Sequence, residues 1–311
     1  MKTEFFTKPK SLHIARRTFA AMLLLLVCAV MMSGCLCIYK MPRHVTLSGK
    51  HTTLTATPET DKVYRIEIDN MSFTNSKNVK IDIAYSETPS VEATINEDLL
   101  DYGFAITMKN GVLRVGPSRH LDIKTDHFEL SIRARFDEID LTGGYGVNID
   151  AGGAESLLFD VSGAADGTIE NLAVSDFKAK ISGAGSFVIS GAAERAYINV
   201  SGAGDIKCPE LICGELETKI SGIGSFELAG SANHANVQIS GTGSVEAAGF
   251  TCDSLEARIS GSGSVTMAVR DTLSATISGM GSVDYYGSPI VKQSVSGLGS
   301  VSQKSTSLPG A

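Results

Sequence analysis

The side chain that recurs most regularly in this sequence is serine, the nucleophile of many hydrolytic enzymes. Eight Val-Ser-Gly or Ile-Ser-Gly triplets place serines at positions 162, 182, 201, 221, 240, 260, 278 and 296. A catalytic serine is typically presented by Gly-x-Ser-x-Gly, and a phosphate loop needs Gly-x-Gly-x-x-Gly or a Walker sequence, but none of these occurs. Eight equivalent serines therefore indicate a structural repeat, and we assign no catalytic residue.

Histidines and carboxylates, the other side chains suited to chemistry, show no metal-ligand spacing. The six histidines are scattered, and Gly202-Ala-Gly-Asp205 lacks the nine-residue period of calcium-binding repeats. Asp137, Glu138 and Asp140 form an acidic cluster that we expect on a surface loop. We expect no metal and no cofactor. A carbohydrate-active enzyme, which needs clustered carboxylates, is the weakest alternative for the function.

The cysteines give no redox or zinc motif, because no Cys-x-x-Cys pair is present. We expect Cys208, Cys213 and Cys252 to be buried thiols that act as small hydrophobic side chains. A Cys208–Cys213 disulfide remains open as the alternative in an oxidising compartment.

The N-terminus has the order of charged, apolar and small residues that is typical of a secretory signal. The apolar run from Phe19 to Met32 is shorter than the roughly 20 residues that a membrane-spanning helix needs. Met32-Ser-Gly-Cys35 resembles a bacterial lipobox. We therefore expect residues 1–34 to be a lipoprotein signal peptide, Cys35 to carry the lipid that attaches the protein to a membrane, and residues 35–60 to be a tether.

The net charge restricts the classes of partner, and the composition restricts the classes of fold. The chain of 311 residues has a net charge of −7, which disfavours nucleic acid as a partner. Trp is absent, and 32 Gly accompany 8 Pro, a balance that favours short strands and tight turns.

The serine triplets recur every 18 to 20 residues, and such a period is typical of stacked units. The five residues before each serine alternate between apolar and polar, as in Leu216–Ile220, which indicates a half-buried strand. A second alternating segment follows each pair of glycines. We therefore predict an all-β fold, a right-handed parallel β-helix or β-solenoid with coils of about 19 residues. An antiparallel meander with the same turns is the alternative.

The repeated Ser-Gly-x-Gly-Ser phrase is expected to form the corner of each coil. Glycine there would permit positive φ and close approach of the backbone, and the serine hydroxyls would hydrogen-bond to one another along the stack. The structural repeat residues are Ser182, Gly183, Gly185, Ser201, Gly202, Gly204, Ser221, Gly222, Gly224, Ser240, Gly241, Gly243, Ser260, Gly261, Gly263, Ser278, Gly279 and Gly281.

We predict one solenoid domain over residues 61–303, with a tail over 304–311. Residues 141–303 hold the repeats, and residues 61–140 are expected to form irregular coils and a cap. Asn110-Gly111 predicts a hairpin turn. Gln293 takes a position that is apolar in earlier repeats, which we interpret as a polar end cap that stops edge-to-edge growth. The strand-like segments of the cap are 63–68, 79–84, 91–95, 104–108, 112–115 and 128–132.

Outward positions of the repeat strands offer a candidate binding face. The residues that we select are Tyr197, Asn199, Asn236 and Gln238. Their aromatic and amide groups suit a glycan or a protein of the envelope or host, although solvated decoration of the sheet is the plainer interpretation.

The sequence resembles the head GIN domain family of auto-transporter adhesin-like proteins. The resemblance covers about residues 62–302 and rests on Gly111-Val-Leu-Arg-Val, on Phe128-Glu-Leu-Ser-Ile-Arg-Ala-Arg-Phe and on the serial Ile-Ser-Gly-x-Gly-Ser phrase. It implies an exported β-helical domain with an adhesive or envelope role and transfers no catalytic residue.

Together these features predict a lipid-anchored, non-enzymatic, adhesin-like binding module of the cell envelope, expected as an outer-membrane lipoprotein. The membrane face stays open. The alternative is a periplasmic-facing envelope scaffold.

Overall fold

The computed structural model describes residues 43–47, 49–58 and 63–305. The predicted signal peptide and Cys35, the residue that we expect to carry a lipid, lie outside the described residues. Within the described part, 21 strands and one short 3-10 helix, η1 (Glu97–Tyr102), make up the regular structure. None of the described helices is long and apolar enough to cross a membrane.

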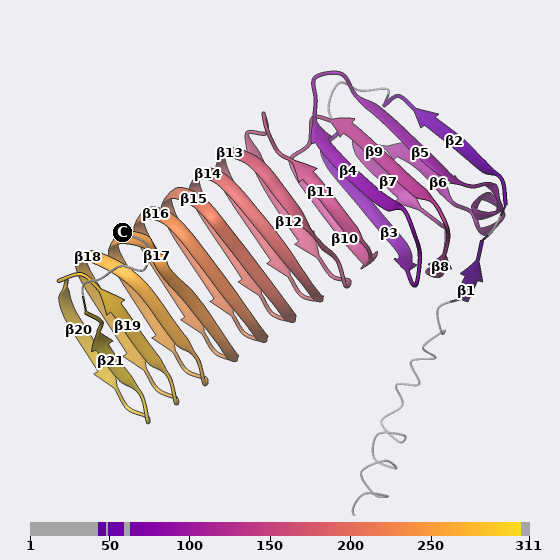
Figure 1. The fold of residues 1–311 in the computed structure, drawn as a ribbon. Coiled ribbons are helices and arrows are strands. Elements are labelled where there is room, and N and C mark those ends of the chain that lie inside the picture. The colour runs from indigo at the N-terminus through magenta and orange to yellow at the C-terminus, as the bar shows by residue number, and fades with distance from the viewer. Residues whose placement is uncertain (1–42, 48, 59–62, 306–311) are drawn as a thin grey trace, which may run out of the picture. The chain divides into compact units, whose positions relative to one another are not determined.

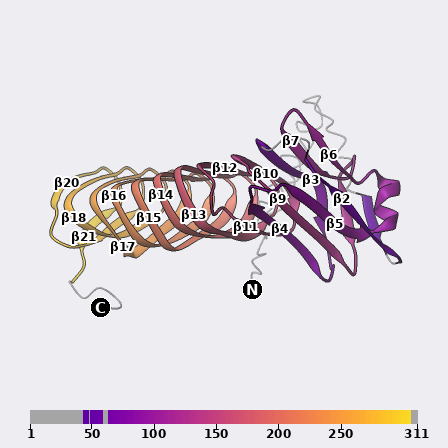
Figure 2. The same cartoon turned by 90° about the horizontal axis from the view of Figure 1, so that it is seen from above.

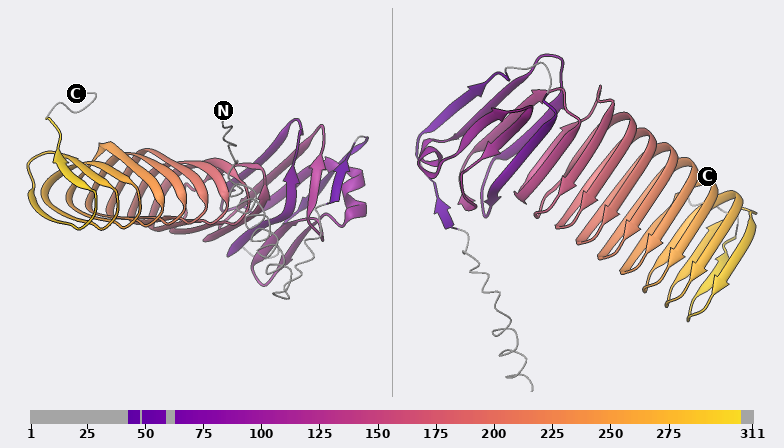
Figure 3. Two further views of the ribbon diagram at one scale, coloured as in Figure 1. Left: turned by 90° about the horizontal axis from the view of Figure 1, so that it is seen from below. Right: turned by 180° about the vertical axis from the view of Figure 1, so that it is seen from behind.

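The Ser-Gly repeats form a stack of parallel strands, in which each coil pairs with the equivalent residues of the next (Figure 1, Figure 3). From above, β13 to β18 follow one another as successive turns of a coil (Figure 2). The parallel β-solenoid is therefore confirmed, with about 20 residues per turn, and the antiparallel meander is wrong. The strands are β12 (Ser156–Val161), β13 (Asp166–Ile181), β14 (Ala184–Val200), β15 (Ala203–Ile220), β16 (Ile223–Ile239), β17 (Thr242–Ile259), β18 (Ser264–Ile277), β19 (Ser282–Tyr286), β20 (Ile290–Val295) and β21 (Ser300–Gln303).

In-register pairing places like residues on like along the core. The residue before each repeat serine forms one column: Ile181, Val200, Ile220, Ile239, Ile259, Ile277 and Val295. The inward residues at the middle of these strands are small or medium-sized and buried, as the alternation predicts. They are Ala179, Thr218, Val237, Ala257 and Ala275.

The N-terminal region joins the stack through parallel pairs, β3 with β10 and β4 with β11. It differs from the repeats because β2–β5, β5–β9 and β6–β7 are antiparallel. Asn110 and Gly111 have φ of 52° and 77° between β6 and β7, so the predicted hairpin turn is confirmed. The strands are β1 (Arg43–Thr46), β2 (His51–Ala56), β3 (Arg65–Phe73), β4 (Val79–Tyr85), β5 (Ser90–Asn96), β6 (Ala105–Lys109), β7 (Val112–Gly116), β8 (Leu121–Lys124), β9 (Phe128–Ala134), β10 (Glu138–Gly144) and β11 (Gly146–Asp150).

Two expectations for the N-terminal region are wrong. Part of the expected tether is strand, since β1 pairs with β8 and the Thr-rich β2 pairs with β5. Alternating Thr, Leu and Ala residues suit an edge strand that is only half-buried. The acidic cluster also lies partly in a strand rather than a loop. In β10, Glu138 pairs with Arg65 at 2.7 Å, and burial raises the pKa of Asp140.

The corners explain why glycine recurs. A Cβ on Gly222 would lie 1.9 Å from the carbonyl oxygen of Gly202, and one on Gly241 would lie 2.0 Å from that of Gly222. Neither glycine has a φ in the left-handed region. Close approach of stacked backbones, and not positive φ, is therefore what excludes side chains at this position.

The repeat serines do not form the expected continuous hydroxyl ladder. Thr142 Oγ1 and Ser162 Oγ lie 2.9 Å apart. Ser182 and Ser296 instead donate to the carbonyls of Val161 and Ile277, one coil earlier, at 3.2 and 3.5 Å. The hydroxyls thus satisfy backbone acceptors as well as one another.

The three described cysteines are buried free thiols, as we expected, and no Cys208–Cys213 disulfide forms. Burial raises the pKa of Cys208 and Cys252 to about 12 and that of Cys213 to about 11. These thiols are therefore neutral and unreactive near pH 7.

We predict that Gly222→Val destabilises the protein by about 3 kcal/mol, because the new side chain must push apart two stacked coils. Gly146→Val is the matched control, since a Cβ at Gly146 meets only one atom, 4.0 Å away. Chemical denaturation of both variants measures the difference. Equal midpoints for the two variants would refute the close-approach explanation.

We predict that Thr218→Val stabilises the protein by about 1 kcal/mol. Thr218 is fully buried, and its hydroxyl has no hydrogen-bond partner in the described part of the chain. Valine has nearly the same shape and removes the cost of burying an unpaired hydroxyl. The exposed Thr276→Val should bring no such gain in denaturant titrations, and a less stable Thr218→Val protein would contradict the prediction.

Candidate functional site

The outward residues of the repeat strands form two columns on one face of the stack. Residues four positions before each repeat serine form the first column: Lys178, Tyr197, Glu217, Asn236, Glu256, Ser274 and Lys292. Residues two positions before the serine form the second: Lys180, Asn199, Lys219, Gln238, Arg258, Thr276 and Ser294. The register of the coils thus fixes the order of side chains along the face.

A groove of about 1010 Å³ follows the first column, and we call it the Tyr197 groove. Tyr197 and Asn236 lie in one wall. The opposite wall consists of residues six positions before the serine: Asp176, Arg195, Glu215, His234, Ser254 and Thr272. Apolar residues between the walls, such as Phe177, Leu216 and Leu255, are buried beneath it. The groove therefore combines an apolar floor with two polar walls.

The ring of Tyr197 is held between two lysines. Lys178 Nζ and Lys219 Nζ lie 5.4 and 5.2 Å from its centroid, which is the range of cation–π attraction. Glu217 lies 2.7 Å from Lys219 Nζ, and this hydrogen bond raises the pKa of Lys219. The half-buried ring is thus fixed in orientation before any ligand arrives.

The opposite wall is also ordered by contacts between coils. Arg195 donates two hydrogen bonds of 2.7 Å to the carboxylate of Asp176, and the pair holds the pKa of Asp176 below its usual value. His234 Nδ1 and Ser254 Oγ lie 2.5 Å apart. Charged and polar groups therefore line the wall in fixed positions.

The four predicted binding residues share one face but not one site. Asn199 and Gln238 line a second groove of about 440 Å³, together with repeat serines such as Ser240. The Glu217–Lys219 pair of β15 separates the β14 residues from those of β16. Contacts within single strands join the two grooves: Gln238 Nε2 donates to Asn236 Oδ1 at 3.3 Å, and the Glu217–Lys219 and Glu256–Arg258 ion pairs link the same two columns.

Sequence reasoning missed the second wall of the Tyr197 groove. Asp176, Arg195 and His234 each stand six residues before a repeat serine. Alignment of the repeats on their serines would have found this column, because the position is polar or charged in most coils.

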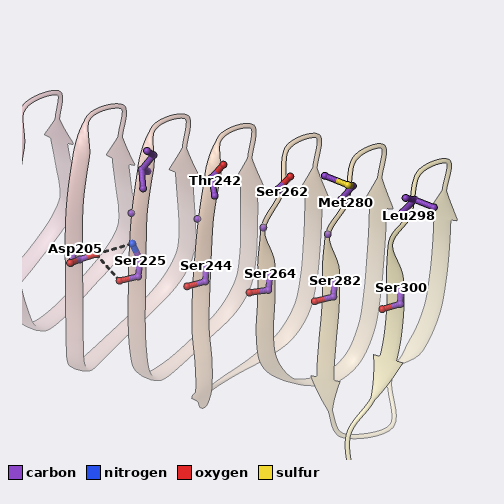
Figure 4. Close-up of a pocket in the computed structure, with 15 residues that line it drawn as sticks. Asp205, Ser225, Thr242, Ser244, Ser262, Ser264, Met280, Ser282, Leu298 and Ser300 are labelled. Carbon is purple, nitrogen blue, oxygen red and sulfur yellow. Dashed lines mark hydrogen bonds between the residues drawn. The ribbon is translucent and has the colours of Figure 1, made fainter. Parts of the chain in front are cut away.

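A third groove, of about 650 Å³, lies at the corners, and of the structural repeat residues only the second glycines Gly224, Gly243, Gly263 and Gly281 line it (Figure 4). Its floor is the second glycine of the phrase, and one wall is a row of serines: Ser225, Ser244, Ser264, Ser282 and Ser300. Asp205 closes the row by accepting hydrogen bonds from Ser225 N and Oγ at 3.0 and 2.7 Å. With Asp205 as its one titratable lining residue, this groove offers hydrogen bonds and no acid–base pair.

No group of three or more His, Cys, Asp or Glu side chains in the described ranges is arranged to hold a metal ion. The three grooves all run along the stack and present fixed polar groups. This arrangement suits reversible binding of an extended ligand.

Comparison with known proteins gives a family and a fold. The family model "Putative auto-transporter adhesin, head GIN domain" matches residues 72–224 and 210–289. No curated protein matches the chain.

Solved structures of three Parabacteroides proteins share the fold. A "putative adhesin" of Parabacteroides merdae is 24% identical, with a TM-score of 0.60 over 85% of this chain and 100% of that chain. A "putative adhesin" of Parabacteroides distasonis is 22% identical, with a TM-score of 0.58 over 84% and 100%. A "putative lipid binding protein" of the same species is 19% identical, with a TM-score of 0.55 over 85% and 100%.

Proposed function

The chain belongs to the auto-transporter adhesin-like head GIN domain family, and from that premise we propose that it is a non-enzymatic binding module of the cell envelope. Its Tyr197 groove receives an extended partner. The observation that carries this proposal is the continuity of the groove across the coils from β13 to β18 and β20. A ligand that lies along the stack meets a new pair of polar side chains at each coil, about 4.8 Å apart.

A glycan chain is the partner that the groove favours. Its C-terminal half presents mainly uncharged hydrogen-bonding groups, among them Asn236, Ser254 and Ser274. The rigid Tyr197 adds a large surface that loses little conformational freedom on binding. Such groups bind the hydroxyls and ring faces of sugars without requiring a charged ligand.

The charges of the groove support binding over glycan cleavage. Of the four carboxylates that line the groove, three form ion pairs and Glu215 is the fourth. The pairs are Asp176 with Arg195, Glu217 with Lys219, and Glu256 with Arg258. A glycosidase needs one carboxylic acid with a raised pKa to protonate the leaving group. Arg195 has the opposite effect on Asp176, whose pKa is lowered.

We further propose attachment to the outer membrane through a lipid on Cys35. The lipobox-like Met32-Ser-Gly-Cys35 supports this assignment. The net charge of −7 disfavours nucleic acid as a partner. If the domain faces the periplasm, the same groove serves an envelope scaffold.

We predict that Asn236→Ala weakens glycan binding about tenfold, the loss expected for one hydrogen bond near 1.4 kcal/mol. The full-length protein is screened on an array of bacterial and host glycans, and the affinity of the best ligand is then measured for each variant. Asn233→Ala is the matched control, since Asn233 lies on the same strand but outside the Tyr197 groove.

Equal weakening by both alanine variants, or glycan cleavage by the wild-type protein, would contradict the proposal. Protease accessibility on intact and lysed cells distinguishes a domain on the cell surface from one that faces the periplasm. Cleavage on intact cells supports the adhesin, and protection until lysis supports the scaffold.

A further inference from the structure

The last coil of the stack ends in an uncovered strand. Within the described residues, β20 pairs with β18 on one side and with no strand on the other, and Figure 1 shows no strand beyond β20 and β21. An edge strand of this kind presents unpaired backbone N–H and C=O groups. The C-terminal edge is therefore ready to pair with another strand.

The side chains of β20 show the same lack of cover. Val291 and Val295 are 36% and 40% exposed, whereas Leu273 and Ile277, their partners one coil earlier, are 1% and 0% exposed. Leu298, which follows β20, is 85% exposed. The apolar columns of the core thus continue to the edge and stop there without a partner.

We propose that β20 pairs with β20 of a second copy of this chain, antiparallel and centred on Gln293. The sequence of β20 is self-complementary in this register. Val291 of one copy lies opposite Val295 of the other, and Gln293 lies opposite Gln293. The outward Lys292 lies opposite Ser294.

Neighbouring registers are worse for identifiable reasons. The inward residues of both strands must lie on the same face of the sheet. The twofold axis must therefore pass through a residue and not between two residues, because an axis between residues would place inward residues opposite outward ones. A centre at Lys292 would place two lysines opposite each other, and like charges there are destabilising. A centre at Ser294 would place Val295 opposite Gln293 and leave Val291 beyond the paired strand.

The proposed contact is isologous, which means that the same surface of each copy is used. A twofold axis through Gln293 uses the same edge of both copies, so the assembly ends at a dimer and does not grow into a fibre. This changes our interpretation of Gln293. Its amide is not simply an end cap, because two facing amides can hydrogen-bond across the axis.

The first test is the oligomeric state of the full-length protein in detergent, measured by sedimentation velocity. We expect a dimer. Gln293→Lys should weaken it at least tenfold, because two ammonium groups then face each other, and Ser294→Glu should tighten it by pairing with Lys292 of the partner. Thr276→Lys, at an exposed position one coil earlier, is the control that adds the same charge away from the edge.

The second test locates the axis. Residues directly opposite in an antiparallel pair have Cα atoms about 4.5–5.5 Å apart, which a disulfide can span. Gln293→Cys should therefore form a covalent dimer when copper phenanthroline is added as the oxidant, and Thr276→Cys should not. The native Cys208, Cys213 and Cys252 are buried, and the wild-type protein corrects for cysteines elsewhere.

Thermal melts establish that each variant is folded. A wild-type monomer, an open series of higher oligomers, or a dimer that Gln293→Lys leaves unchanged would overturn the proposal. Equal cross-linking of the Gln293→Cys and Thr276→Cys variants would overturn it as well. None of these outcomes depends on glycan binding, so the dimer and the proposed function fail or succeed separately.

Discussion

Everything in the repeat region depends on how closely one coil can lie on the next. At the Ser-Gly corners, a Cβ would come within 1.7 to 2.0 Å of the carbonyl oxygen one coil earlier, at Gly183, Gly222 and Gly261 alike. Only glycine leaves room for this approach. Because every coil meets the constraint at the same position, the strands between corners are kept in register, and equal positions stack into columns.

The columns connect sequence to surface. Inward positions give a continuous apolar core that includes Ile220 and Ile239, and outward positions give the walls of the grooves. A substitution on the surface therefore changes the side chain that one coil contributes to a groove and leaves the side chains of the neighbouring coils in place. At the C-terminal edge the same columns end uncovered, and for this reason binding along the stack and pairing at its end are separate properties.

The sequence was enough to predict the stack, its register and its inward residues. All three follow from the spacing of the serine triplets and from the alternation of apolar and polar residues before each serine. It also located most strands of the N-terminal region, such as 79–84 within β4 and 112–115 within β7. It could not give their direction, because residues 63–140 contain no repeat, and alternation is the same in parallel and antiparallel strands. The Thr-rich β2 was missed because a half-buried edge strand has too few apolar residues to be told from a tether.

The candidate site was only partly predictable. Tyr197 and Asn236 were found from alternation alone, but the groove also needs Arg195 and His234, which become its wall through the pairing of neighbouring coils. Contacts such as Lys178 and Lys219 on the Tyr197 ring join residues of three coils. Such a site depends on register as much as on composition.

The most direct test of the in-register stack is a set of distances between spin labels along one column, measured by pulsed electron paramagnetic resonance. Labels at Lys178 and Glu256, Lys178 and Ser274, and Lys178 and Lys292 span four, five and six coil steps. At one strand spacing per coil, we predict backbone separations of about 19, 24 and 29 Å. Separations that fail to rise by one constant step would contradict the parallel, in-register stack on which the grooves and the edge both rest.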